Sequence, residues 1–390
     1  MAEDHRHLAL FILSLSGGGA QQRMMTLAHA FAARGHKVDL VVVRSQDPPR
    51  QEISPLVRLV ALDPWWTYLP WVKKGPWTLA SIPALARYLR RERPAVLLSC
   101  CHLVNVIAPW ARALTRVRTK LVIRIGTHLS RPAVNIQKRF ELWQARHFYP
   151  WADAIISISN GVADDVARVT GLPRERIAMI YNPVVTPELQ EKMRAPLDHP
   201  WFAPGSPPVL LAVGRLVAQK DFPTLLKAFA RVRAIRPARL VILGEGKKRT
   251  KLERLARQLG VAADVALPGF VLNPFPYMVR ASVFVLSSAW EGFGNVVAEA
   301  MACGCPVVST DCPSGPAEIL DGGAYGPLVP VGDDAALAEA ILSVLKRPPD
   351  PNRLRTRAAL FSVDHTADRY LELLLGPCRG EQPKNTISHE

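Results

Sequence analysis

The chain has 390 residues, of which 49% are hydrophobic, so it is long enough for two domains that each have a core. No apolar run approaches the ~18 residues of a membrane-spanning helix, and residues 8–15 are too short an apolar stretch for a secretory signal. The six cysteines show neither the spacing of a disulfide scaffold nor the Cys-x-x-Cys pairs of a zinc site. We therefore expect reduced, mostly buried thiols and a cytoplasmic protein without a membrane span.

The formal net charge of +16 is concentrated in one part of the chain. Residues 73–146 contain fifteen Lys and Arg but only two acids, Glu92 and Glu141. Tryptophan and lysine side chains gather just before this stretch and at its start, namely Trp65, Trp66, Trp71, Lys73, Lys74 and Trp77. Tryptophan favours the bilayer interface and lysine favours anionic head groups, so this segment predicts docking on an anionic membrane surface. The alternative is a surface loop packed on its own domain; no motif supports nucleic-acid binding.

In chain order, short runs rich in Val, Ile and Leu alternate with helical patterns. The first half has predicted strands at residues 8–13, 37–43, 95–99, 120–125 and 154–158, and helices at about 20–33, 79–91, 135–148 and 162–169. The second half has predicted strands at residues 209–213, 240–243, 265–267, 283–286 and 306–309, with helices between them and at 334–345. This alternation is typical of parallel sheets covered on both faces. Two such blocks predict an α/β protein with two Rossmann-like domains.

A proline-rich break separates the two blocks, because proline stiffens linkers and stops strands. We expect an N-terminal domain over residues 1–183, a linker over 184–207 and a second domain over 208–361. A helix over 362–376 and a polar tail over 377–390 follow.

The segment at residues 288–308 carries the clearest chemical signal. Glu291 and Glu299 stand with seven residues between them, and a Gly-x-Gly loop, Gly292-Phe293-Gly294, opens the predicted helix. A helix start presents unpaired backbone N–H groups and the positive end of a dipole, which suit a phosphate. Carboxylates accept hydrogen bonds from pairs of hydroxyl groups. Together these features predict a nucleotide-sugar site.

The Glu291-x7-Glu299 arrangement resembles the retaining glycosyltransferases of family 4, which have the GT-B fold. Residues 211–222, with Arg215 and Lys220, look like the family's phosphate-binding segment, and residues 152–159, 180–183 and 16–20 resemble motifs of its N-terminal domain. The resemblance covers roughly residues 8–375. It implies two Rossmann-like domains whose parallel sheets face each other across a cleft. The N-terminal domain would bind the acceptor, the C-terminal domain the nucleotide sugar, and the last helix would cross back to the first domain.

The same resemblance implies roles for individual residues. Arg215 and Lys220 would bind the diphosphate in place of a metal ion, so neither a metal nor a cofactor is expected; the chain also lacks an Asp-x-Asp motif. Glu291 would hold sugar hydroxyls, and Glu299 would hold those of the ribose. The other expected donor-binding residues are Gly292, Phe293, Gly294, Asn295, Val296, Gly244, Phe270, Val271 and Leu272.

Residues of the first domain are expected to complete the site. His128 follows a strand, where many family members have a histidine that contacts the donor sugar, and Arg124 lies just before it. Both are candidate catalytic residues, with a structural side chain as the alternative for each. The glycine loop of Gly17, Gly18 and Gly19 would let the acceptor or the diphosphate approach the first helix.

The function that these features favour is transfer of a sugar from a nucleotide donor, with UDP as the favoured nucleotide, to a lipid-linked or growing glycan. Assembly of a bacterial surface polysaccharide, lipopolysaccharide or glycan at the inner face of the cytoplasmic membrane would fit. The alternatives are a soluble sugar synthase with the same fold, a non-catalytic sugar- or lipid-binding scaffold, and a basic nucleic-acid-binding protein.

Overall fold

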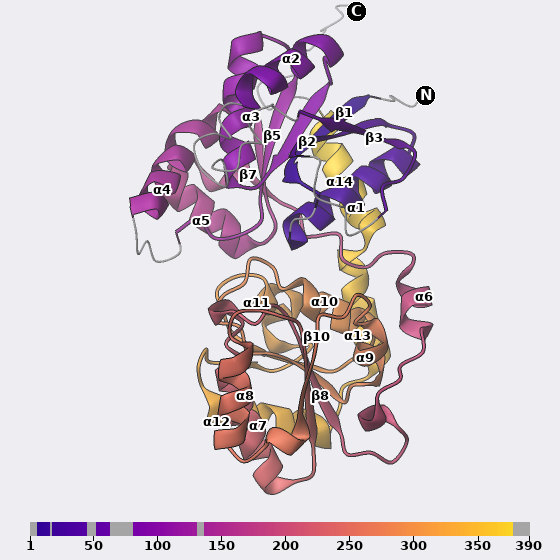
Figure 1. The fold of residues 1–390 in the computed structure, drawn as a ribbon. Helices are drawn as coiled ribbons and strands as arrows, with labels where there is room; N and C mark the ends of the chain where they lie inside the picture. Colours follow the sequence, from indigo (N-terminus) through magenta and orange to yellow (C-terminus); the bar gives the residue numbers. More distant parts are fainter. Residues whose placement is uncertain (1–5, 16–17, 45–51, 63–80, 131–135, 377–390) are drawn as a thin grey trace, which may run out of the picture. The chain divides into compact units, whose positions relative to one another are not determined.

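The computed structural model describes residues 6–15, 18–44, 52–62, 81–130 and 136–376. The chain folds into two compact units (Figure 1). Unit 1 comprises Met1–Ile158, Val162–Ile180 and Asp364–Glu390, and unit 2 comprises Ser159–Gly161 and Tyr181–Val363. Unit 2 is therefore an insertion in the sequence of unit 1.

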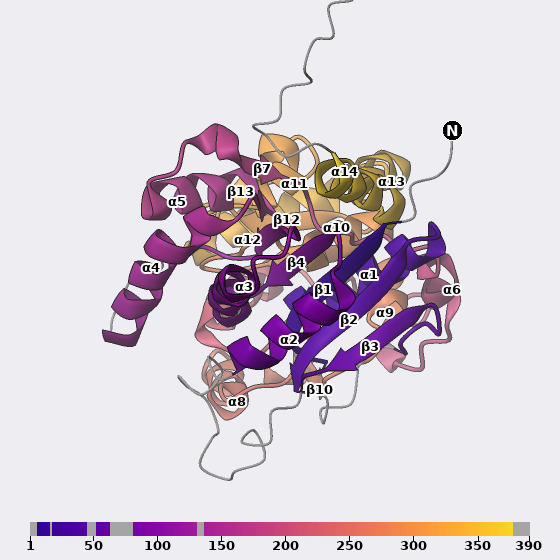
Figure 2. The ribbon, with the colours of Figure 1, turned by 90° about the horizontal axis from the view of Figure 1, so that it is seen from above.

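Unit 1 is built on a parallel sheet of seven strands in the order β3-β2-β1-β4-β5-β6-β7. The strands are β1 His7–Ser14, β2 Lys37–Arg44, β3 Val57–Ala61, β4 Val96–Cys100, β5 Lys120–Ile125, β6 Ala154–Ser157 and β7 Ile177–Met179. Figure 2 shows β1 to β4 side by side. The central strands are rich in Val, Ile and Leu, as is typical of a parallel sheet that is covered on both faces.

The helices of unit 1 form two layers. They are α1 Gly19–Ala33, α2 Ile82–Glu92, α3 His102–Thr115, α4 Ile136–Phe148, α5 Asn160–Thr170, which begins in the short segment of unit 2, and α14 Val363–Leu375. Side chains of α2, α3, α4 and α5 share one core with the sheet. On α1 and α14, Phe31 and Tyr370 pack with their ring centroids 6.5 Å apart.

Unit 2 is built on a parallel sheet of six strands in the order β10-β9-β8-β11-β12-β13. The strands are β8 Val209–Val213, β9 Arg239–Leu243, β10 Val265–Gly269, β11 Val283–Leu286, β12 Val307–Thr310 and β13 Leu328–Val329. The helices are α6 Leu189–Arg194, α7 Phe222–Ile235, α8 Arg249–Gln258, α9 Phe275–Arg280, α10 Asn295–Ala302, α11 Pro316–Ile319, α12 Asp334–Lys346 and α13 Pro351–Ala358. Helices α7, α8 and α12 share one core with the sheet.

Helix α14 is fastened to unit 1 by polar contacts along its length. Arg34 donates to Asp364 and Asp368 at 3.0 Å each, and the Lys120 ammonium donates to the Leu373 carbonyl at 2.7 Å. In the middle of the helix, the Tyr370 hydroxyl accepts a hydrogen bond from Arg124 Nε at 2.9 Å. The last segment of the chain thus completes the first unit.

The prediction of an α/β fold with two parallel-sheet domains is confirmed. Strands β3, β7 and β13 and helices α3, α6, α11 and α13 were not among the predicted elements. Helix α3 contains Pro109, whose missing N–H and bulky ring usually interrupt a helical pattern. Among the described residues, no helix has the length and apolar character needed to cross a bilayer.

Candidate active site

The loops after β8, β9 and β10 of unit 2 are joined by backbone hydrogen bonds at the carboxyl end of the sheet. Gly214 donates to the Leu243 carbonyl at 2.9 Å, and Gly244 donates to the Gly269 carbonyl at 2.7 Å. Gly244 has a φ of +144°, and a Cβ at this position would lie 2.0 Å from the Gly214 carbonyl oxygen. Only glycine fits here. Parallel α/β sheets bind ligands at this end, so the loops form a platform for one.

The loop after β11 leads into α10 through a left-handed residue. Gly294 is the N-cap of α10, with φ 92° and ψ 48°, a conformation that glycine adopts without strain. The first backbone N–H groups of α10, those of Asn295 and Val296, therefore point out of the helix start, where they favour an anion. Phe293, buried beside them, packs its ring 5.4 Å from that of Tyr181.

Glu291 is held in a fixed position by three donors. Its side chain is almost buried, and Oε1 lies 2.7 Å from the Lys220 ammonium and 2.7 Å from the Ser288 hydroxyl. Gln219 Nε2 lies 3.4 Å from Oε2 and 2.9 Å from the Trp290 carbonyl. Burying a carboxylate is costly unless it is paired and hydrogen-bonded, and this one is both. The less engaged Oε2 atom remains the better acceptor for a ligand hydroxyl.

Lys220 is also positioned by its neighbours. It ends a short 3-10 helix, Ala218–Lys220, and its carbonyl accepts a hydrogen bond from Ser287 at 2.8 Å. A Cβ on Gly214 would lie 2.7 Å from Lys220 Cε, so the glycine after β8 leaves room for the lysine stem. Arg215, which follows Gly214 in the sequence, is exposed and forms no salt bridge with a described residue. One cation is thus paired with Glu291 and the other faces solvent.

The remaining predicted donor residues lie on the same loops and helix. Glu299 is half-buried on α10, on the turn after the helix start. Phe270 and Leu272 follow β10 and are 61% and 80% exposed, which is unusual for large apolar side chains and leaves them accessible to a flat ligand such as a base. Their role in binding stays a prediction, as do those of Val271 and Gly292.

In unit 1, His128 follows β5 and lies near a buried carboxylate. Its Nδ1 lies 3.7 Å from Asp165 Oδ2, and Asp165 also accepts a hydrogen bond from the Ser130 backbone at 3.0 Å. Burial opposes ionisation of Asp165, but hydrogen bonds from His128 and Ser130 outweigh it and hold the pKa of that carboxyl below its usual range. Asp165 thus places a negative charge beside the imidazole, and the catalytic role of His128 stays a prediction.

The side chain of Arg124 is buried and bonded within unit 1. It is 1% exposed, and its guanidinium donates to the Tyr370 hydroxyl at 2.9 Å and contacts the Cys100 sulfur at 3.1 Å. These contacts favour the structural alternative for Arg124. Of the first glycine loop, Gly18 caps α1 and Gly19 begins it. Gly17 and the segment with Trp65, Trp66, Trp71, Lys73, Lys74 and Trp77 lie outside the described residues.

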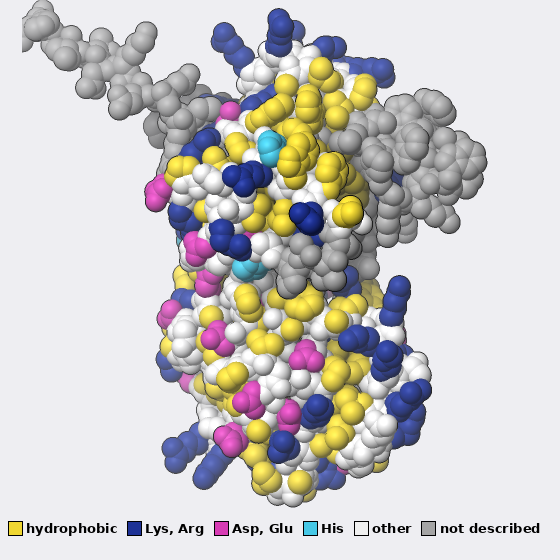
Figure 3. Space-filling model, turned by 90° about the vertical axis from the view of Figure 1, so that its left-hand side faces the viewer, with side chains coloured by type: hydrophobic (Ala, Val, Ile, Leu, Met, Phe, Trp, Pro, Cys, Tyr) yellow, Lys and Arg dark blue, Asp and Glu magenta, His cyan; other side chains and the backbone are white. Residues whose placement is uncertain are grey.

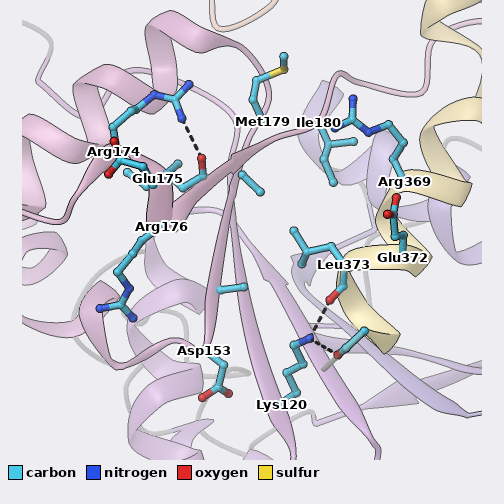
Figure 4. A pocket seen from close by; sticks show the side chains of 14 residues that line it. Lys120, Asp153, Arg174, Glu175, Arg176, Met179, Ile180, Arg369, Glu372 and Leu373 are labelled. Carbon is cyan, nitrogen blue, oxygen red and sulfur yellow. Dashed lines mark hydrogen bonds between the residues drawn. The ribbon is translucent and has the colours of Figure 1, made fainter. Parts of the chain in front are cut away.

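An open pocket of about 930 Å³ lies in unit 1 beside the edge strand β7. Figure 4 shows basic and acidic side chains around it, with Lys120 donating to carbonyls at the end of α14. Arg174, also at its rim, donates to the Ile177 carbonyl at 2.9 Å. None of the predicted site residues lines this pocket. Its mixed charges indicate no particular ligand, whereas the loops of unit 2 combine cations, a helix start and carboxylates.

Sequence reasoning found Lys220 and Glu291 but missed the contact between them and the roles of Gln219 and Ser288. Ser288 lies three residues before Glu291, a spacing at which a hydroxyl reaches a carboxylate when the loop turns back. Gln219 gave no such signal, because its partners lie 71 and 72 residues away. Among the described residues, no group of three or more His, Cys, Asp or Glu side chains could hold a metal ion.

The chain matches known protein families over both units. The model described as Glycosyltransferase Family 4 matches residues 17–187, and the model described as Glycosyl transferases group 1 matches residues 195–361. The lipopolysaccharide core biosynthesis glycosyltransferase LpsE of Rhizobium meliloti (strain 1021) is 32% identical over 294 residues, 73% of this chain and 77% of LpsE. This chain belongs to the family 4 glycosyltransferases.

Other relatives of this glycosyltransferase match it over nearly its whole length. It is 29% identical over 382 residues to the N-acetylgalactosamine-N,N'-diacetylbacillosaminyl-diphospho-undecaprenol 4-alpha-N-acetylgalactosaminyltransferase of Campylobacter jejuni subsp. jejuni serotype O:2, covering 95% of this chain and 99% of that protein. Among solved structures, the lipopolysaccharide outer core galactosyltransferase WaaB aligns with a TM-score of 0.73 at 19% identity, covering 95% of this chain and 99% of WaaB. The Anabaena HepE complex with UDP-glucose also gives 0.73 at 19% identity, covering 96% and 100%. These structures support the GT-B fold.

Proposed function

We propose that this glycosyltransferase moves a sugar from a nucleoside-diphosphate donor, with a UDP-sugar favoured, to a lipid-linked or growing glycan. The acceptor would be an intermediate of a surface polysaccharide, lipopolysaccharide or glycoprotein glycan, and the enzyme would act at the inner face of the cytoplasmic membrane. The observation that carries the proposal is the Lys220–Glu291 pair at 2.7 Å, beside the start of α10. Its relatives act, by their names, on an undecaprenol-linked glycan and in lipopolysaccharide core synthesis.

Stabilising the departing nucleoside diphosphate is the first task of the site. Arg215 presents a planar guanidinium that can bind two phosphate oxygens at once, and the start of α10 adds oriented N–H groups. Lys220 would add a second cation for the same diphosphate. These positive charges would stabilise the diphosphate in place of a divalent metal ion, so we propose that transfer proceeds without a metal. Addition of a chelator tests this and should leave the rate unchanged.

Holding the sugar and ribose is the second task. Glu291 is fixed by Lys220 and Ser288 through Oε1, which leaves Oε2 to accept from sugar hydroxyls. Glu299, one turn into α10, would accept from the ribose hydroxyls.

We propose that the anomeric configuration of the sugar is retained. The acceptor oxygen forms its bond to the anomeric carbon on the face from which the phosphate oxygen leaves. The acceptor proton passes to that phosphate oxygen, so no side chain is needed as a base, and His128 would contact the sugar rather than take the proton. Proton NMR of the fresh product reads the configuration directly, and an inverted product would refute this step.

Thermal unfolding with UDP, GDP, ADP or no nucleotide tests the donor site. A ligand at one hundred times its dissociation constant adds roughly 2.7 kcal/mol to the free energy of unfolding. We expect UDP to raise the melting temperature of the wild type and of Glu339→Ala, an exposed carboxylate on α12. Glu299→Ala should lose this shift and most of the transfer activity. Full turnover by Glu299→Ala would falsify the ribose assignment, and no shift with any nucleotide would favour a non-catalytic scaffold.

A further inference from the structure

Helix α4 carries apolar side chains on the side that faces solvent. Ile136, Phe140 and Trp143 are 85%, 55% and 48% exposed, while Gln144 and Ala145 face the core. The spacing of four and three residues places the first three side chains on one stripe of the helix. A helix that packs only against its own domain buries its apolar stripe. Within the described part of the chain, this stripe has nothing to cover it.

The stripe continues onto neighbouring elements through packed rings. Trp110 of α3 lies 5.2 Å from Trp151, which ends the 3-10 helix Tyr149–Trp151, and Phe148 lies 5.6 Å from Trp151 and 5.8 Å from Trp143, measured between ring centroids. We call the exposed set the aromatic face; it consists of Trp110, Leu114, Ile136, Phe140, Trp143 and Trp151. Figure 3 views the side that carries α4 in Figure 1 and shows hydrophobic side chains gathered there among Lys and Arg. A contiguous apolar surface of this kind marks an interaction site.

The surroundings of the aromatic face are basic. Residues 102–118 and 136–153 contain six Lys and Arg and two acids. Both acids are neutralised, since Glu141 pairs with Lys138 at 2.9 Å and Asp153 pairs with Arg112. Arg139 and Arg146 lie seven residues apart along one edge of the apolar stripe, are exposed, and form no salt bridge with a described residue. Their guanidinium groups are available to external anions.

We propose that the aromatic face docks on a bilayer surface with anionic lipids. Tryptophan and phenylalanine rings insert at the level of the head groups, and arginines at their edge bind lipid phosphates while their stems lie along the apolar surface. A second copy of the chain fits less well, because a two-fold contact brings the same positively charged arginines toward each other. The inference deepens the proposed function, since a lipid-linked acceptor is reached from such a surface. It uses none of the residues between 63 and 80.

Sedimentation of the full chain with vesicles tests the proposal. We expect binding to vesicles of phosphatidylcholine and phosphatidylglycerol in equal parts, and weaker binding to phosphatidylcholine alone. Phe140→Glu/Trp143→Glu should weaken binding by more than about tenfold, because charges replace the inserting rings. The control is Ile235→Glu, a 69% exposed residue at the end of α7, which should bind like the wild type.

The contribution of charge is tested separately. Arg139→Glu/Arg146→Glu should weaken binding to the anionic vesicles by about tenfold or more. The same reversal at Arg254 and Arg257, exposed on α8 of unit 2, should leave it unchanged. Unaltered melting temperatures show that each variant is folded.

Three results would overturn the proposal: a wild type that does not bind anionic vesicles, double variants that bind as well as the wild type, or a wild-type dimer in light scattering that the Phe140→Glu/Trp143→Glu variant splits. The last result would assign the aromatic face to a second copy. The UDP-induced rise in melting temperature and transfer to a water-soluble acceptor report on the proposed function without lipid. If the wild type does not bind vesicles but shows the UDP-induced shift and the transfer activity, only the docking proposal is removed. If it binds vesicles but shows neither the shift nor the activity, only the proposed function is removed.

Discussion

Removing the Lys220 ammonium is the sharpest test of how this site is built. The Lys220–Glu291 pair is 2.7 Å apart, and the two side chains are only 14% and 10% exposed. At an effective dielectric constant of ~20, their direct attraction is about 6 kcal/mol, most of which offsets desolvation. Deleting one partner of a buried pair lowers the free energy of unfolding by about 3–5 kcal/mol. Because this pair is slightly exposed, we expect Lys220→Met to lose about 3 kcal/mol, the lower end of that range.

Differential scanning calorimetry of Lys220→Met measures this loss. For a unit of this size, 1 kcal/mol corresponds to roughly 2–4 °C, so we expect the transition of unit 2 to fall by about 6–12 °C. Lys227→Met, an exposed lysine on α7, is the matched control and should change it by no more than about 2 °C. The double variant Lys220→Met/Glu291→Gln should recover most of the stability, because no unpaired buried charge remains.

Transfer activity separates the two roles of the pair. Lys220→Met should lower kcat by about a hundredfold or more, as loss of a charge-stabilising donor does elsewhere, and the stabilised double variant should not regain it. The reasoning is refuted if Lys220→Met unfolds within about 0.5 kcal/mol of the wild type. It is also refuted if the double variant recovers activity together with stability.

Three further predictions concern the stability of the two units. Gly244→Ala, with a strained φ and a clash with the neighbouring backbone, should destabilise unit 2 by more than about 3 kcal/mol, whereas Gly332→Ala, with a φ of +81° and open space, should cost about 1 kcal/mol in urea unfolding. Tyr370→Phe removes the acceptor for buried Arg124 and should cost about 1–3 kcal/mol; equal stability would show that another group replaces the hydroxyl. Asp39 is buried, yet hydrogen bonds from His7, Arg58 and Tyr88 hold its pKa below the usual range, so its stabilisation is present above pH ~4 and is lost as the pH falls further. Asp39→Asn should therefore lower stability at pH 7 and differ less from the wild type at pH 3, and a constant difference would contradict this.

The fold was predictable where the chain repeats a strong local pattern. The buried apolar runs of β1, β4, β5 and β8 lie within about one residue of their predicted bounds, because both faces of these strands are covered. Strand β3 was missed because it is an edge strand in which only Val57 is buried, and β13 because it has two residues. Helix α3 was missed because Pro109 interrupts its pattern, although the surrounding core holds it in place.

The individual residues of the candidate site were predictable, but the contacts between them were not. Arg215, Lys220, Glu291 and Glu299 were singled out by spacing and family resemblance, which are local properties of the chain. The ion pair of Lys220 with Glu291 joins residues 71 positions apart, and only the packing of β8 beside β11 brings them together. The environment of Arg124 was unpredictable for the same reason, since it is set by Tyr370, 246 positions away.

That long separation has a consequence for synthesis of the chain. Unit 2 is contiguous from Tyr181 to Val363 apart from three residues, but unit 1 lacks α14 until the final residues emerge. At roughly 5–20 residues per second, the Arg124 side chain waits about 12–50 s for the Tyr370 hydroxyl. During this interval the nascent first unit exposes the side of its sheet that α14 later covers, while the inserted unit can already fold. Ribosome-bound chains that end before α14 should therefore present a native second unit beside an incomplete first one, and this face is where chaperones would be expected to bind.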